Sequence, residues 1–274
     1  MDRIRKALDL ARLERVQPVD PAPEASRGND PAGEPAARPT PMTIRYSRTR
    51  VFAVDRTVME RSRIMHPASS DPAAAAYRML RTQVLQRMHA HSWRSLAVFS
   101  PASEDGKTTT AINLAVSLAG GRLHTVLLVE FDFKHPSIAE RFGLQPEFGV
   151  DDVLLGQSSI EDSLYHPDQF DRLVIMPART TLDDASNVLA GPLAQALVNE
   201  LQNRYPERLI VFDLPPVLST DDALSFAPLV ECGLLVAAEG QTRRDDLLRT
   251  VELLSKTPLV GTVLNRSSDR LAEY

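Results

Sequence analysis

The chain has 274 residues, of which 43% are hydrophobic and 24% charged, ordinary values for a soluble globular protein of one or two domains. Its net charge of −5 argues against a nucleic-acid-binding protein, which needs a basic face, and its single cysteine, Cys232, excludes an internal disulfide. No stretch approaches the ~20 consecutive apolar residues of a membrane span. The charged N-terminal stretch does not resemble a secretory signal, so we expect a cytoplasmic protein.

The first 70 residues differ in composition from the rest. Residues 1–16 predict a basic amphipathic helix with Ile4, Leu8 and Ala11 on one face, which either docks on a partner or lipid surface or remains solvent-exposed. Residues 17–42 contain seven of the 20 prolines and predict a disordered, fairly stiff linker, because they bury too little apolar surface to offset the entropy of ordering. Residues 43–70 carry scattered apolar side chains and predict a short strand or an arm that packs on the core domain.

Residues 71–274 alternate between apolar runs and helical periodicity, and we expect them to form the core domain. Near-continuous apolar runs predict buried strands at residues 95–100, 126–129, 173–176, 209–212, 234–237 and 260–264. An apolar stripe at helical spacing predicts a helix at residues 73–89, and we expect further helices at residues 107–119, 192–203 and 244–254. Apolar strands separated by helices are typical of a parallel sheet covered on both faces. The predicted fold class is therefore α/β, with a mostly parallel, twisted sheet.

A phosphate-binding loop follows the first of these strands. The sequence PASEDGKTTT (residues 101–110) places Gly-Lys-Thr between a strand and a helix, which is the setting of a P-loop NTPase. Backbone N–H groups and the positive helix end would hold phosphates, Lys107 would reach the β- and γ-phosphates, and the Thr108 hydroxyl would bind Mg²⁺. The match is imperfect, because the first glycine of the pattern is replaced by Pro101. The predicted nucleotide-binding residues of the loop are Ser103, Glu104, Asp105, Gly106, Lys107, Thr108 and Thr109.

Three acidic residues follow or end predicted strands. Glu130 and Asp132 come at the end of the second strand, and alternation along a strand would put both on one face. Asp213 ends a later apolar strand, which is where P-loop nucleotidases carry the acid on the Mg²⁺ side. Open α/β sheets bind ligands at this carboxyl edge. We therefore expect the three carboxylates to meet beside the P-loop.

With these segments the chain resembles the bacterial tyrosine kinases of capsule and exopolysaccharide loci, the CpsD/CapB-type autokinases. It is most similar to the autokinases of exosortase-linked exopolysaccharide loci. The resemblance covers roughly residues 70–268 and rests on AYRMLRT (76–82), DGKTTTAINLA (105–115), VLLVEFDFKHP (126–136), FDLPPVL (212–218), EGQTRR (239–244) and VLNR (263–266).

The resemblance implies an ATP- and Mg²⁺-dependent protein-tyrosine kinase. It assigns catalytic roles to Lys107, Glu130, Asp132 and Asp213, and metal binding to Thr108, Glu130 and Asp213. Asn265 and Arg266 match a segment that lies near the adenine in related ATPases. The implied partner is a membrane chain-length regulator of polysaccharide export, which would recruit the kinase to the inner face of the membrane.

The chain departs from the family pattern at three places. The first of the paired acids is usually Asp, and Glu130 places its carboxylate about one bond length further out, a scale to which catalysis is sensitive. The ring-assembly motif retains Arg78 and Arg81 but has Ala75 in place of Glu, which puts homo-oligomerisation through this helix in question. The family's tyrosine-rich tail is reduced to Tyr274, which is our candidate phosphoacceptor because a chain end can reach a neighbouring site.

Two other functions stay open, and the departures motivate the first of them. The chain could be an ATP-binding regulatory switch of the same polysaccharide machinery with little transfer activity. A MinD/ParA-like ATPase shares the fold, but its loop carries an additional lysine where this chain has Ala102, so this function ranks last.

Overall fold

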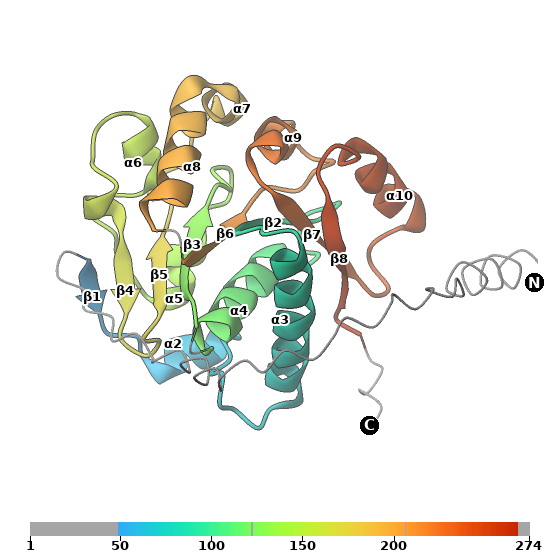
Figure 1. Cartoon of the computed structure of the whole chain (residues 1–274), viewed down its shortest axis with the longest axis horizontal. Coiled ribbons are helices and arrows are strands. Elements are labelled where there is room, and N and C mark those ends of the chain that lie inside the picture. Colours follow the sequence, from blue (N-terminus) through green and yellow to red (C-terminus); the bar gives the residue numbers. More distant parts are fainter. Residues whose placement is uncertain (1–48, 122, 206, 268–274) are drawn as a thin grey trace, which may run out of the picture. The chain divides into compact units, whose positions relative to one another are not determined.

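The computed structural model describes residues 49–121, 123–205 and 207–267, which build an eight-stranded sheet with helices on both faces (Figure 1). The strands are β1 (Arg50–Phe52), β2 (Ser95–Phe99), β3 (Thr125–Glu130), β4 (Tyr165–Pro167), β5 (Leu173–Met176), β6 (Arg208–Asp213), β7 (Cys232–Ala238) and β8 (Leu259–Asn265). The helices are α2 (Arg56–Arg61), α3 (Pro72–Ala90), α4 (Lys107–Ala119), α5 (Ile138–Phe142), α6 (Val150–Leu154), α7 (Ala185–Ala190), α8 (Pro192–Arg204), α9 (Asp222–Phe226) and α10 (Arg244–Leu253), with 3₁₀ turns at Glu161–Ser163 and Ala227–Leu229.

The strand order is β1-β4-β5-β3-β6-β2-β7-β8. Every neighbouring pair is parallel except β4 and β5, so the predicted mostly parallel sheet is confirmed. The central strands β3, β6 and β2 are adjacent, and Glu130 at the end of β3 pairs with Asp213 at the end of β6. The carboxyl ends of these strands therefore meet at one edge, beside the loop that leaves β2.

Buried apolar side chains form one layer on each face of the sheet. The first layer packs the sheet against α6, α7, α8 and α9, and the second packs it against α2, α3, α4 and α5. Part of the predicted arm contributes to the second layer, through the buried side chains of Val54, Met59 and Ile64. The domain boundary at residue 70 stays a prediction, and the expected helix at 1–16, linker at 17–42 and Tyr274 lie outside the described residues.

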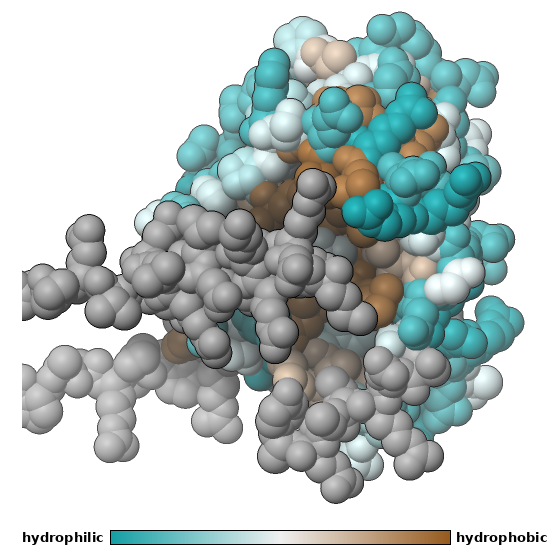
Figure 2. Space-filling model, turned by 90° about the vertical axis from the view of Figure 1, so that its right-hand side faces the viewer, coloured by the Kyte–Doolittle hydropathy of each residue, from teal (hydrophilic) through white to brown (hydrophobic). Residues whose placement is uncertain are grey.

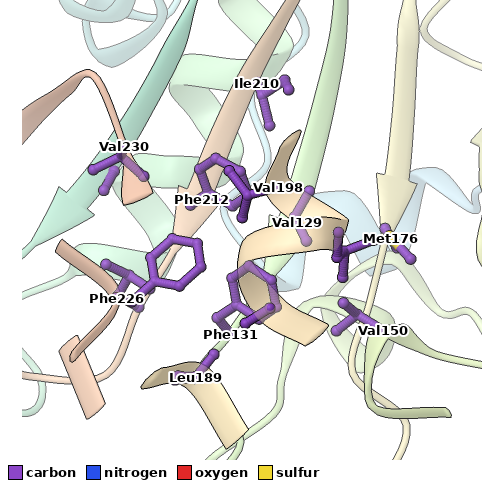
Figure 3. Packing of buried hydrophobic residues seen from close by; sticks show 14 of the residues in the cluster. Val129, Phe131, Val150, Met176, Leu189, Val198, Ile210, Phe212, Phe226 and Val230 are labelled. Carbon is purple, nitrogen blue, oxygen red and sulfur yellow. The ribbon is translucent and has the colours of Figure 1, made fainter. Parts of the chain in front are cut away.

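An aromatic cluster holds the segment that follows β3. The Phe131 ring lies 5.6 Å from Phe212 of β6 and 4.5 Å from Phe226 of α9, measured between ring centroids (Figure 3). The backbone N–H of Phe131 also donates to the carbonyl oxygen of Asp213 at 2.7 Å. Because Phe131 lies between Glu130 and Asp132, this packing limits where both acidic side chains can go.

Strand β8 forms one edge of the sheet, and Figure 2 faces that side of the molecule, where hydrophobic residues lie among hydrophilic ones. Leu264 of β8 and Leu248 of α10 are exposed. An open edge strand invites pairing with another chain. The Arg87 guanidinium of α3 donates to the Val260 carbonyl, and a Cβ at Gly261, whose φ is +155°, would lie 2.8 Å from this guanidinium. Gly261 therefore allows Arg87 to cover part of the edge.

The two arginines of the ring-assembly motif contact their own chain. Arg78 donates to the backbone carbonyls of Pro67 and Ser69 at 3.1 and 3.0 Å, and Arg81 donates to the carbonyl of Ser117 in α4 at 3.0 Å. Assembly through α3 stays a prediction, and it would have to break or share these hydrogen bonds.

Replacing Arg81 with alanine is expected to lower the free energy of unfolding by about 1–2 kcal/mol, because the carbonyl of the buried Ser117 loses a charged donor. Urea unfolding followed by circular dichroism measures the change. Gln83→Ala on the same helix, at an exposed position, is the control and is expected to change stability by less than about 0.5 kcal/mol. Equal stabilities of the two variants would contradict a bracing role for Arg81.

The predicted helix at residues 107–119 is confirmed at both ends, and the predicted long strands agree within two residues. Strand β1 lies in the stretch for which a short strand or an arm was expected. The sequence patterns missed the short elements β4, α2, α5, α6, α7 and α9, because three to six residues show little periodicity. None of the helices in the described part of the chain has both the length and the apolar character to cross a membrane.

Candidate active site

The loop between β2 and α4 exposes the N-terminus of a 13-residue helix. Glu104 and Gly106 have left-handed backbone conformations, with φ of 66° and 90°. A Cβ at Gly106 would lie 1.9 Å from Asn265 Nδ2, so only glycine fits there. Within the described residues no side-chain hydrogen bond caps α4, so the N–H groups of its first turn remain available for an anion.

Three residues that were predicted to bind the nucleotide form hydrogen bonds with the phosphate-binding loop. The buried Asp105 carboxylate accepts hydrogen bonds from the Ala102 N–H at 2.9 Å and from the Thr242 hydroxyl at 2.6 Å. Asn265 Nδ2 donates to the Asp105 carbonyl at 2.9 Å, and Arg266 donates to the Glu104 carbonyl at 2.7 Å. Asp105 therefore directs its charge away from the phosphate side, and contact of Asn265 and Arg266 with adenine stays a prediction.

The P-loop lysine lies between two of the predicted acids. Lys107 Nζ lies 2.8 Å from Asp213 Oδ1 and 3.4 Å from Asp132 Oδ2, and all three side chains are buried. Burial lowers the pKa of Lys107, but the carboxylates of Asp213 and Asp132 outweigh it and the pKa is raised. Lys107 is therefore an ammonium ion. Burial raises the pKa of Asp213 despite the opposing charge of Lys107.

Glu130 has other partners. Its Oε1 accepts from the backbone N–H groups of Ser137 at 2.5 Å and Ile138 at 2.9 Å, and its Oε2 accepts from Ala178 at 3.1 Å. The expectation that Glu130 and Asp132 share one face of a strand is wrong, because β3 ends at Glu130. Metal binding and catalysis by Glu130 stay predictions, and they would require its carboxylate to leave these backbone donors.

A cavity of about 370 Å³ opens over Lys107. Its lining includes most of the predicted P-loop residues together with side chains that follow β3. The lining residues are Ser100, Ala102, Ser103, Glu104, Gly106, Lys107, Thr108, Thr109, Asp132, His135, Ser137, Arg141 and Pro216. The sequence motifs do not predict His135, Ser137 or Arg141 as site residues, because no P-loop motif includes them and only the fold of the segment after β3 brings them to the loop.

The residues present fit a nucleotide with Mg²⁺. An uncapped helix N-terminus and a buried ammonium suit phosphates, and the Thr108 hydroxyl lies 3.3 Å from Lys107 Nζ. Asp213 Oδ2 is buried and has no hydrogen-bond partner within the described ranges, which leaves it available to a hydrated cation. No cluster of three or more His, Cys, Asp or Glu suited to a metal occurs among the described residues. Mg²⁺ does not need one, because it is held by one or two carboxylates together with substrate phosphates.

Comparison with known proteins decides the family. The AAA domain family matches residues 98–257, more than half of the chain. The solved kinase domain of VpsO is 30% identical over 72% of this chain and 96% of its own length, with a TM-score of 0.65. The tyrosine-protein kinase YwqD of Bacillus subtilis is 27% identical over 72% of this chain and 83% of its own length.

This chain is a bacterial tyrosine kinase of the AAA domain family. A longer relative, the succinoglycan biosynthesis transport protein ExoP of Rhizobium meliloti, is 28% identical over 81% of the kinase and 29% of its own length. The kinase therefore aligns with only part of ExoP. Other solved proteins of this fold contain Mg-ADP or an ATP analogue with magnesium, so nucleotide and Mg²⁺ suit the fold in general.

Proposed function

We propose that this kinase uses ATP and Mg²⁺ to phosphorylate tyrosines of this same protein. This autophosphorylation would regulate exopolysaccharide or capsule polymerisation and export. The observation that carries the proposal is the buried Lys107, held between Asp132 and Asp213 under a cavity at the uncapped end of α4. Phosphoryl transfer needs positioning and charge neutralisation more than covalent help from the protein. A buried ammonium, an uncapped helix end and two carboxylates supply these functions.

Each side chain has a distinct role in this proposal. Lys107 attracts the terminal phosphates and neutralises charge that develops on them, and bound Mg²⁺ would be held by Thr108 and Asp213 and would neutralise further charge. Asp132 lies at the cavity wall, where a carboxylate can orient a tyrosine hydroxyl and accept its proton. The loop contacts from Asp105, Asn265 and Arg266 keep the phosphate-binding backbone in its left-handed turns.

The phosphorylated tyrosine is proposed to be Tyr274. Among the described residues, the Tyr165 hydroxyl is engaged by the backbone of Glu147 and Phe148, and Tyr77 is largely buried, which raises its pKa. Tyr205 is 45% exposed, but it precedes β6, whereas Asp213 at the active site ends β6. Six residues of strand span about 20 Å, so Tyr205 lies too far from the active site of its own chain to be phosphorylated there.

Phosphotyrosine mapping tests this assignment. The purified full chain is incubated with Mg-ATP, and its intact mass and phosphopeptides are measured for the unaltered chain, Tyr274→Phe and Tyr205→Phe. The expected result is phosphotyrosine that falls sharply in Tyr274→Phe and is unchanged in the Tyr205→Phe control. Unchanged phosphorylation of Tyr274→Phe would exclude Tyr274 as the main acceptor.

One observation favours an ATP-binding switch as the second candidate function. The Glu130 carboxylate, which the family pattern assigns to catalysis, is bound by backbone N–H groups and does not line the cavity. A switch would bind Mg-ATP without forming phosphotyrosine. The MinD/ParA-like alternative has less support, because relatives that match most of the chain are tyrosine kinases.

The proposed partner is a membrane chain-length regulator of polysaccharide export that brings the kinase to the cytoplasmic face of the membrane. Support comes from the relationship to ExoP, which is named as a polysaccharide transport protein. Co-purification of the tagged kinase with such a regulator from detergent-solubilised membranes tests this part. Recovery of the kinase from the soluble fraction alone, with the regulator present, would contradict it.

A further inference from the structure

The cavity over Lys107 has a second cation on its wall. Arg141 of α5 is half-buried and lines the cavity together with Lys107 and Asp132. Its Nη1 donates to the Thr109 hydroxyl at 3.2 Å, and its Nε lies 3.4 Å from the Ser137 hydroxyl. Thr109 directly follows Thr108, so the guanidinium lies next to the first turn of α4, where the phosphates are expected.

Arg141 differs from Lys107 in its partners. Lys107 is already paired with Asp213 and Asp132, whereas Arg141 makes no ion pair within the residues that the structure describes. Its two hydrogen bonds go to neutral hydroxyls and use two of the five N–H donors of a guanidinium. A half-buried guanidinium without a carboxylate can donate to a phosphate without first giving up an ion pair.

The charges around the cavity are mainly negative, so a second cation would favour phosphate binding. Glu104 and Asp132 line the cavity and Asp213 lies directly beneath it, so the carboxylates outnumber Lys107. A polyphosphate entering this site meets a local excess of negative charge, which Lys107 alone does not cancel. Arg141 adds a second positive charge to the cavity lining, and its planar guanidinium can donate two parallel hydrogen bonds to phosphate oxygens.

We infer that Arg141 binds the phosphate chain of the nucleotide and is a second phosphate-binding cation of this kinase, acting together with Lys107. This inference rests on the proposed function only in taking ATP as the ligand. On binding, Arg141 exchanges its hydroxyl acceptors on Thr109 and Ser137 for phosphate oxygens. No bond other than hydrogen bonds changes in this step.

The test is the affinity of the full chain for Mg-ATP and Mg-ADP, measured by titration calorimetry. Arg141→Gln is expected to weaken Mg-ATP binding by about 10- to 100-fold, which corresponds to the loss of one or two charge-assisted hydrogen bonds. Arg141→Lys, which keeps the charge but loses the fork, is expected to fall between Arg141→Gln and the unaltered chain. The matched control is Arg56→Gln on α2, where an exposed arginine pairs with Glu60 away from the cavity.

Thermal unfolding distinguishes phosphate binding by Arg141 from a purely structural role of this residue. Loss of phosphate binding reduces the rise in melting temperature caused by a fixed concentration of Mg-ATP, since that rise depends on the dissociation constant. A structural role would lower the melting temperature without nucleotide and leave the Mg-ATP affinity of the folded protein unchanged. An Arg141→Gln affinity within twofold of the unaltered chain would overturn the inference.

The binding measurement is independent of phosphoryl transfer. A chain that binds Mg-ATP with an Arg141-dependent affinity but forms no phosphotyrosine would contradict the kinase proposal and support this inference. Absence of Mg-ATP binding by the unaltered chain would overturn both.

Discussion

Replacing Lys107 with alanine is expected to reduce tyrosine phosphorylation by about 10³-fold or more, because it removes the buried cation that neutralises the transferred phosphates. The same change leaves Asp213 and Asp132 without their ammonium partner. Phosphotyrosine formed per unit time from Mg-ATP, measured by intact mass, reports the loss. The matched control is Lys256→Ala, at an exposed lysine that follows α10.

The Lys107 variant also needs a folding measurement, since breaking a buried ion pair by removing one partner costs about 3–5 kcal/mol. Lys107→Arg keeps the charge and is expected to remain folded, while its larger group misplaces the phosphates. A folded Lys107→Arg protein with strongly reduced phosphorylation would assign the loss to the site. Phosphorylation within threefold of the unaltered chain in both variants would contradict the role of Lys107.

The second large effect concerns Glu130 and pH. Burial raises the pKa of Glu130 to about 8; the backbone N–H groups of Ser137, Ile138 and Ala178 oppose this shift, and the charge of Asp213 adds to it. Between about pH 4.5 and pH 8 the folded chain therefore holds a proton on Glu130 that the unfolded chain has lost. Stability falls as pH rises through this window, with a slope of at most about 1.4 kcal/mol per pH unit and a total of at most about 5 kcal/mol.

Glu130→Gln isolates this effect, because the amide has the same shape and no titration. Its stability is expected to vary less between pH 5 and pH 8 than that of the unaltered chain. At low pH, where both side chains are neutral, a cost of about 1–3 kcal/mol is expected, because the amide places an NH₂ where a carboxyl oxygen accepts a backbone N–H. Urea unfolding at several pH values gives both quantities. Parallel stability curves for the two proteins would show that Glu130 does not titrate in this window.

The outcome also bears on function. A protonated Glu130 is a poor metal ligand, since Mg²⁺ prefers ionised oxygen ligands. If the pH series gives the expected result, Glu130 has a structural role: it holds the segments around Ser137 and Ala178 in place. Metal binding is then assigned to Thr108 and Asp213. This would explain how an acid one methylene longer than the family's Asp is accommodated.

Local sequence determined the main elements and the phosphate loop of this protein. The helix at residues 107–119 was predictable because Gly106 and Gly120 flank an apolar stripe, and the strand ending at Asp213 because it is an uninterrupted apolar run. Both signals are carried by neighbouring residues. The proximity of Lys107 to Asp132 and Asp213 was also predictable, since parallel strands bring their carboxyl ends to one edge.

Only the tertiary structure shows which groups bind the carboxylates of the site and which further side chains line the cavity. The Glu130 carboxylate is bound by the N–H of Ala178, 48 residues further along the chain, and the Asp105 carboxylate is bound by the Thr242 hydroxyl, 137 residues further on. Arg141 reaches the cavity from a five-residue helix that has no periodicity to predict it. Such contacts depend on strand order, and the Ala178 N–H is a backbone donor that any residue type except proline supplies. For that reason a single sequence leaves no trace of them, and only the fold shows which groups meet.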